Sequence, residues 1–165
     1  GHTREIGRRL KQMIESSTNQ VTLVSVIDAI PELNAFDKIV IGASIRYGKH
    51  SRQIYQFIKL NQQLLDAKPN AFFSVNVVAR KPEKSKPETN VYLQKFLRQI
   101  TWKPKNLAVF AGKIDYPRYN FWDRSMIRFI MWMTKGPTDT QGTFEFTDWQ
   151  KVDQFAAQLV QQTTQ

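Results

Sequence analysis

Apolar and polar positions follow two periods along this chain, and stretches of the two periods alternate. Short apolar runs rich in β-branched residues are typical of strands, and repeats of three and four residues are typical of amphipathic helices. The pattern predicts strands at residues 21–26, 38–43, 71–78 and 107–113, and helices at residues 3–16, 51–65, 90–100 and 147–161, the last opened by a capping box at Thr147. Strands that alternate with helices favour a parallel sheet covered on both faces, so we expect an α/β fold.

Residues 115–135 interrupt this alternation with a basic, aromatic segment. Its second half, 126–133, predicts a helix whose apolar surface is broader than one core stripe requires. Arg124 and Arg128 are four residues apart and share a helix face, which Trp132 extends. Such a helix fits a membrane interface or a hydrophobic docking surface, and a plain buried helix is the alternative. It is too short to span a bilayer.

Composition narrows the chemistry that is open to the chain. The 165 residues fit a single domain, 1–165, and include no cysteine, which excludes thiol nucleophiles, disulfides and zinc-thiolate sites. The two histidines, His2 and His50, do not have the spacing of metal ligands, and we expect both to be exposed or to lie at helix ends. We expect no metal site. Asp115 and Asp123 are equally suited to caps or ion pairs, so the sequence identifies no catalytic base.

The net charge of +10 is concentrated in one part of the chain. Residues 78–135 contain 13 Lys and Arg against 4 Asp and Glu, whereas residues 136–165 contain 1 against 4. A localised basic surface indicates an anionic partner such as nucleic acid, an acidic lipid surface or a carboxylated ligand. A solvated lysine-rich face is the alternative.

The segment 38–50 combines a strand with features of a ligand platform. An apolar run ends at small residues and is followed by Arg46, Tyr47 and Gly48 before a helical pattern begins. Ligands of open α/β sheets bind beyond the carboxyl ends of the strands, and a flat aromatic side chain there suits a planar ligand. An ordinary strand-to-helix turn is the alternative.

Four stretches of the sequence together resemble one family. They are IGASIRYGKH, SVNVVARKPEKSKPETN, AGKIDYPRYNFWDRSMIRFIMWM and FTDW. They are similar to the flavodoxin-like, quinone-dependent protoporphyrinogen IX dehydrogenases of bacterial haem synthesis, and the resemblance runs from Gly1 to the closing helix. It implies bound FMN, oxidation of protoporphyrinogen IX to protoporphyrin IX, and transfer of electrons to menaquinone or ubiquinone. It also implies a peripheral protein on the anionic, cytoplasmic face of the bacterial inner membrane.

The resemblance further implies which residues form the site. The end of the family's phosphate loop matches residues 1–3, and two further flavin loops match residues 44–48 and 76–80. The expected cofactor-binding residues are Gly1, His2, Thr3, Ser44, Ile45, Arg46, Tyr47, Gly48, Asn76, Val77, Val78, Ala79 and Arg80. The expected substrate or membrane contacts are Lys81, Tyr116, Arg118, Tyr119, Trp122, Arg124 and Arg128.

One departure from the family concerns the sheet. A flavodoxin-like, three-layer open sheet has five parallel strands in the order 2-1-3-4-5, and this sequence supplies four. The family's first strand, which is central, and the front of its phosphate loop are expected before Gly1. We therefore expect an N-terminally truncated member with two unpaired strand edges in the middle of the sheet.

Other functions remain open from the sequence. A flavodoxin-type electron carrier usually has an acidic surface, which the basic segment contradicts. A nucleic-acid-binding module would suit the charge, but the chain has no helix-turn-helix, RNP or KH signature, so we expect no nucleic-acid partner. A flavin-free remnant that only binds partners is the third alternative.

Overall fold

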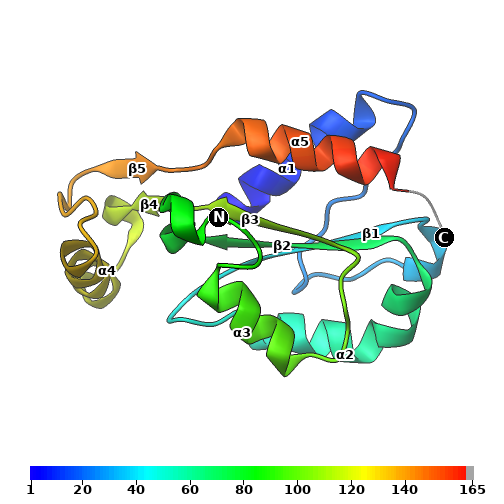
Figure 1. The fold of residues 1–165 in the computed structure, drawn as a ribbon, viewed down its shortest axis with the longest axis horizontal. Helices are drawn as coiled ribbons and strands as arrows, with labels where there is room; N and C mark the ends of the chain where they lie inside the picture. Colours follow the sequence, from blue (N-terminus) through cyan, green and yellow to red (C-terminus); the bar gives the residue numbers. More distant parts are fainter. Residues whose placement is uncertain (163–165) are drawn as a thin grey trace.

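The computed structural model describes residues 1–162, three fewer than the predicted domain 1–165, and has three layers (Figure 1). The central layer is a parallel sheet in the order β1-β2-β3, formed by β1 (Ile39–Ser44), β2 (Asn70–Asn76) and β3 (Asn106–Ala111). Helices α1 (His2–Glu15) and α5 (Trp149–Gln161) cover one face of this sheet, and α2 (Arg52–Ala67) and α3 (Val91–Gln99) cover the other. The α/β fold predicted from the alternation of periods is confirmed.

The core lies on both faces of β2. All seven residues of this strand are buried, because it has a neighbour on each side and helices above and below. Phe72 packs toward α2 and α3, whereas Phe73 and Val75 pack toward α1 and α5. A continuous apolar run is the pattern expected of such a strand. Gly42 of β1 is needed here, because a Cβ at this position would lie 2.1 Å from Cζ of Phe73.

The expected strand at 21–26 is not formed. Residues 21–25 have no regular secondary structure and a turn begins at Val26, and Leu23 and Val24 are exposed. In the family order it would pair only with the first strand, and residues 1–162 contain no strand that does so. Among residues 1–162, β1 likewise has β2 as its one strand partner. The parallel sheet of the described residues therefore has three strands and not the expected four.

The end of the second predicted strand also differs. The sequence predicted a strand to Val78, but β2 ends at Asn76 and the one-turn helix η2 (Val77–Arg80) follows. The reason is a side-chain cap, because Asn76 accepts a hydrogen bond from the backbone N–H of Ala79 at 3.1 Å. Two further short helices, η1 (Leu33–Ala35) and η3 (Pro82–Lys84), lie in the loops.

The strand predicted at 107–113 is divided at Gly112. β3 ends at Ala111, and β4 (Lys113–Asp115) pairs with β5 (Thr143–Glu145) in an antiparallel ribbon. The division follows from the hydrogen bonds of Gly112, whose N–H donates to Asn76 and whose carbonyl accepts from Phe146. Between β4 and β5 the chain forms η4 (Tyr116–Arg118) and α4 (Phe121–Met133).

The N-cap of the last helix is Asp148, not the predicted Thr147. The Asp148 carboxylate accepts from the N–H of Lys151 at 3.2 Å. The Thr147 hydroxyl instead donates to the carbonyl of Ala111 at 2.9 Å and so ties the start of α5 to the end of β3.

Candidate functional site

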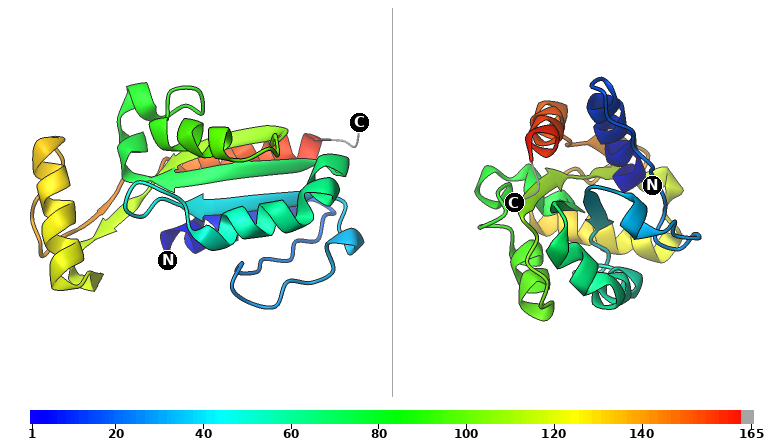
Figure 2. Two further views of the ribbon diagram at one scale, coloured as in Figure 1. Left: turned by 90° about the horizontal axis from the view of Figure 1, so that it is seen from below. Right: turned by 90° about the vertical axis from the view of Figure 1, so that its right-hand side faces the viewer.

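The three predicted loops lie at one end of the sheet, where the parallel strands end. The start of α1, the loop after β1 and the loop after β2 all lie there in Figures 1 and 2. Carboxyl ends of parallel strands are the usual place for ligands in open α/β sheets. The structure therefore brings residues 1–3, 44–48 and 76–80 to the same edge.

The loop after β1 contains a tight turn at Tyr47 and Gly48. Arg46 and Lys49 exchange backbone hydrogen bonds of 2.9 and 3.2 Å across it. Both central residues have positive φ angles, 50° for Tyr47 and 78° for Gly48, which is a type I′ turn. A tyrosine is uncommon in the left-handed region, and this one holds its ring 68% exposed.

The Tyr47 hydroxyl reaches a different element. It donates a hydrogen bond to the Asp123 carboxylate at the start of α4. This bond to an anionic acceptor raises the pKa of Tyr47. The loop at residues 44–48 is thereby connected to α4, which lies within the basic, aromatic segment 115–135.

The start of α1 combines anion-binding character with one acidic group. The first N–H groups of a helix have no partner within the helix and attract anions. His2, half-buried here, is hydrogen-bonded to Glu5 at 2.8 Å and to Thr147, and the bond to His2 lowers the pKa of Glu5. Gly1 is exposed and Thr3 is half-buried.

In the third loop, Arg80 fastens the loop to the end of α4. Its guanidinium donates to the Thr134 hydroxyl at 2.9 Å, to the Thr134 carbonyl at 3.2 Å and to the Val77 carbonyl at 3.2 Å. It also lies over the ring of Phe146, and burial lowers its pKa. Arg80 was predicted to bind the cofactor, and these partners show that its side chain is already committed to contacts within the chain.

Two of the predicted substrate or membrane contacts have other partners. Tyr116 is fully buried, so the prediction of such a contact is wrong for its side chain, and its hydroxyl donates to the Pro137 carbonyl at 2.7 Å. The Arg124 guanidinium donates to the Tyr116 carbonyl at 3.1 Å and to the Tyr119 carbonyl at 3.2 Å. These two hydrogen bonds fix α4 to η4.

The other predicted contacts remain accessible. Trp122 and Arg128 are exposed on α4, Lys81 and Tyr119 are half-buried, and Arg118 is exposed beside Asp115 with 3.6 Å between their charged groups.

Helix α4 projects beyond the end of the sheet, as Figure 2 shows. Met131 is its only buried residue and packs with Ile114 and Tyr116. Sequence reasoning singled out Trp122 as a contact residue but not most of the other exposed apolar side chains of the helix. The exposed apolar residues of α4 are Phe121, Trp122, Met126, Phe129, Ile130, Trp132 and Met133. The broad apolar surface predicted for 126–133 is thus present on the folded helix, and Phe121 and Trp122 extend it toward the start of α4.

His50 was expected to be exposed or to lie at a helix end; it lies directly before Ser51, the N-cap of α2, but it is not exposed. It follows the turn at Tyr47 and is only 3% exposed, packed against the rings of Phe72 and Phe96. Burial lowers its pKa to about 4, so it is neutral near pH 7.

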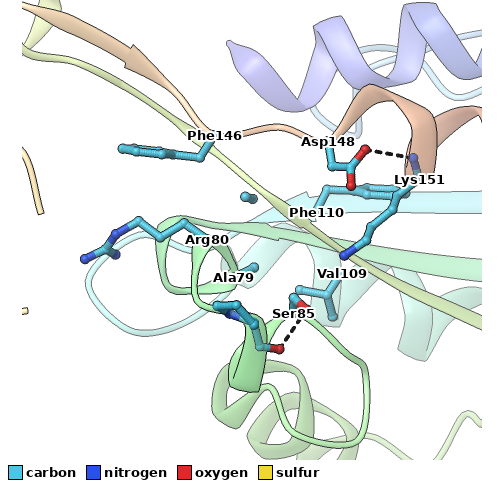
Figure 3. Close-up of a pocket in the computed structure, with 10 residues that line it drawn as sticks. Ala79, Arg80, Ser85, Val109, Phe110, Phe146, Asp148 and Lys151 are labelled. Carbon is cyan, nitrogen blue, oxygen red and sulfur yellow. Dashed lines mark hydrogen bonds between the residues drawn. The ribbon is translucent and has the colours of Figure 1, made fainter.

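Two cavities are lined mainly by residues outside the predicted flavin loops. One of about 290 Å³ lies between Ala79, Arg80 and Ser85 on one side and Phe110, Asp148 and Lys151 on the other (Figure 3). The second, of about 520 Å³, lies between α2 and residues 26–34. Neither is lined by residues 1–3 or 44–48.

The chemistry of the three loops fits a planar, anionic cofactor. The start of α1 supplies an anion site, Tyr47 an exposed flat ring, and Arg46 and Lys49 positive charge beside it. Residues 1–162 contain no group of three metal-ligating side chains and no helix long and apolar enough to cross a membrane.

Comparison with known proteins agrees with this geometry. Residues 1–141 match the family model of the flavodoxin domain. A protein of Escherichia coli K12 named protoporphyrinogen IX dehydrogenase [quinone] is 43% identical over 99% of this chain and 91% of its own length. A Leishmania major protein of the same name is 42% identical over 95% of this chain and 69% of its own length. No solved structure matches the chain. The chain therefore belongs to the flavodoxin family, and its cofactor is a flavin.

Proposed function

We propose that this protein oxidises protoporphyrinogen IX to protoporphyrin IX with a bound flavin and passes the electrons to a membrane quinone. The observation that carries the proposal is the similarity to the E. coli protein of that name, because it extends over 99% of this chain. We assign FMN as the flavin, since the α1 start suits a single terminal phosphate. Menaquinone and ubiquinone are the candidate acceptors.

In the proposed reaction the protein binds the flavin and the substrate and orients them toward each other. When bound, a flavin would supply the redox chemistry by taking hydride from the substrate in three rounds, each with loss of a proton from the substrate and each followed by transfer of the electron pair to the quinone. The N-terminal turn of α1 would hold the phosphate, and Tyr47 would contact the ring system. In the loop after β2 the Ala79 N–H is taken by Asn76 Oδ1, so the N–H groups of this loop that have no partner would face the polar edge of the ring and stabilise its negative charge.

The substrate carries carboxylates on a hydrophobic macrocycle, and the basic segment 78–135 suits those carboxylates. Because Arg80 and Arg124 are held by partners within the chain, the cations that remain for the substrate are Lys81 and Arg118. Lys81 follows β2 and η2 at the end of the sheet where the flavin loops meet, and Arg118 ends η4, which follows β4 of the antiparallel ribbon. Charge-assisted hydrogen bonds from these side chains would orient the macrocycle toward the flavin.

The proposed reaction joins a hydrophobic substrate to a lipid-soluble acceptor, and α4 is suited to that setting. Its exposed apolar residues stand beside the exposed Arg128 and Lys135. A helix with this composition lies in the interface of an anionic bilayer. We place the protein on the cytoplasmic face of a bacterial inner membrane, with α4 as the contact.

Sedimentation with anionic phospholipid vesicles tests the membrane contact. The double variant Phe129→Ser/Trp132→Ser is expected to lose most vesicle binding, because these rings are 58% and 69% exposed on α4. The matched control is Leu60→Ser, an apolar residue that is 84% exposed on α2. Equal vesicle binding by the double variant and the unsubstituted chain would reject the assignment of α4.

Two measurements on the purified protein test the oxidation. The mass of the extracted cofactor should be that of FMN. Anaerobic mixing with protoporphyrinogen IX should bleach the visible absorbance of the bound flavin. The fluorescence of protoporphyrin should follow when a quinone is added, because the full oxidation removes three electron pairs and one flavin holds a single pair. A flavin-loaded protein whose absorbance is unchanged by this substrate would refute the proposed function.

A further inference from the structure

A pair of buried asparagines closes the loop that follows β2. Asn76 ends β2 and Asn90 precedes α3, and both are buried. Their side-chain amides are hydrogen-bonded to each other in both directions, Asn76 Nδ2 to Asn90 Oδ1 at 3.3 Å and Asn90 Nδ2 to Asn76 Oδ1 at 3.2 Å. The two ends of the segment 77–89 are thereby joined.

Each asparagine also holds the backbone of this segment. The Asn76 Oδ1 atom accepts from the N–H of Ala79 at 3.1 Å, which sets the turn η2. Asn90 donates to the Lys84 carbonyl at 2.9 Å, and its Oδ1 atom accepts from the N–H of Leu93 as the cap of α3. One amide pair therefore fixes both ends of the segment 77–89, which contains the third flavin loop, and a point near the middle of this segment.

The same hydrogen-bonded chain reaches the second flavin loop. Asn76 Nδ2 donates to the Ser74 hydroxyl at 3.4 Å, and that hydroxyl is 3.0 Å from Nε2 of His50. His50 comes one residue after the turn formed by 46–49. All four side chains are buried beneath the edge of the sheet where the loops meet.

Four of the five buried polar residues of the described chain belong to this hydrogen-bonded chain. Among the described residues the one other buried polar side chain is Asn70, at the opposite end of β2, where it bonds to the Leu65 carbonyl and the Lys105 N–H. Polar groups in a core are tolerated only when they are hydrogen-bonded, and a bonded network restricts the conformations of the backbone around it.

We infer that Asn76 and Asn90 are positioning residues that hold residues 77–80 in the conformation that binds flavin, and that Ser74 and His50 couple this segment to the 44–48 loop. The inference rests on the proposed flavin site. A loop held in place before binding does not lose conformational entropy when the cofactor arrives, so its amides bind more tightly.

The variant Asn90→Ser separates this role from helix capping. Serine is a good N-cap, so α3 keeps its cap while the amide pair and the bond to Lys84 are lost. The matched control is Asn120→Ser, because Asn120 caps α4 through the N–H of Asp123 at 2.8 Å but has no amide partner among the bonds described. Ser74→Ala is the milder second variant, which leaves both asparagine caps in place.

Hydrogen exchange of the flavin-free protein is the first readout. Asn90→Ser should speed exchange at Ala79 and its neighbours in 77–80, whereas Asn120→Ser should not, and Ser74→Ala should give a smaller effect in the same segment. Unchanged exchange of 77–80 in both Asn90→Ser and Ser74→Ala would overturn the inference. This readout stands even if the unsubstituted chain binds no flavin, an outcome that would refute the proposed function alone.

Flavin affinity and reduction potential are the second readout. The loss of the two hydrogen bonds of the amide pair and of the bond to Lys84 should weaken FMN binding about 10- to 100-fold in Asn90→Ser. It should also shift the midpoint potential of the bound flavin, which a purely structural role would leave unchanged. An affinity and potential equal to those of the unsubstituted chain would overturn the inference.

Discussion

Helices α4 and α5 have the same length, 13 residues, but opposite environments. α5 buries Val152, Phe155, Ala156 and Leu159 against the sheet, whereas α4 buries Met131 alone. Seven of the fourteen large apolar residues that are exposed in the described chain lie on α4. Apolar content alone therefore does not place a helix in the core. α5 belongs to the packed three-layer region, and α4 belongs to a projecting region formed with β4 and β5.

Truncating one phenylalanine in each helix should give the largest contrast between the two regions. Phe155 packs against the rings of Phe73 and Phe110, so Phe155→Ala is expected to lower the free energy of unfolding by about 3–5 kcal/mol. Phe129→Ala should change it by less than about 0.5 kcal/mol, because that ring is already exposed. Urea unfolding measures both values. A loss of similar size in the two variants would remove the distinction between the regions.

Acid should weaken the packed region through His50. Its folded pKa, lowered to about 4 by burial, lies below the ordinary value of 6.5. Between these values the unfolded state binds more protons, so stability rises with pH and is lost as the pH falls from about 6.5 to about 4. The expected loss from this group is about 3 kcal/mol.

The measurement is urea unfolding at a series of pH values, with His50→Leu as the comparison. The variant starts from a different stability, so the slope with pH is the quantity of interest. The slope between pH 6.5 and 4 should be smaller in the variant. Equal slopes would show that His50 does not titrate as its burial requires.

The projecting region should depend on Arg80 for its attachment. Arg80→Met removes the bonds to Thr134 and Val77, and the expected loss of stability is about 1–2 kcal/mol. Thermal unfolding and hydrogen exchange at the end of α4 measure the change. Lys81→Met is the neighbouring control and should have little effect. The tether would be refuted if both variants gave the same exchange at Thr134.

The ion pair between Arg9 and Asp153 should make the smallest difference. It joins α1 to α5 through two bonds of 2.7 Å, but it lies at the surface where water and salt screen it. In a double-mutant cycle with Arg9→Met and Asp153→Asn, the coupling should be smaller than the effect of Arg80→Met and should vanish in 1 M salt. A coupling that persists in high salt would show that the contact is more shielded than its exposure indicates.

The sequence predicted the parts of this fold that local patterns determine. The strands at 38–43 and 71–78 and the helices around the sheet follow from apolar periodicity, and the approach of the three loops follows from parallel topology. The strand at 21–26 could not be judged in this way, because a strand forms only beside a partner. The burial of His50 depends on Phe72, Phe96 and Ser74, which lie more than twenty residues away. The roles of Arg80 and Arg124 depend on backbone carbonyls that only the folded chain brings within reach.

Turnover in vesicles measures the proposed oxidation and the role of α4 together. The flavin-loaded protein is mixed anaerobically with protoporphyrinogen IX and anionic vesicles that contain a quinone, and protoporphyrin fluorescence is followed in time. Protoporphyrin should form steadily, only when both flavin and quinone are present, and much more slowly in Phe129→Ser/Trp132→Ser but not in Leu60→Ser. A rate of protoporphyrin formation no higher than that without protein would refute the proposed function.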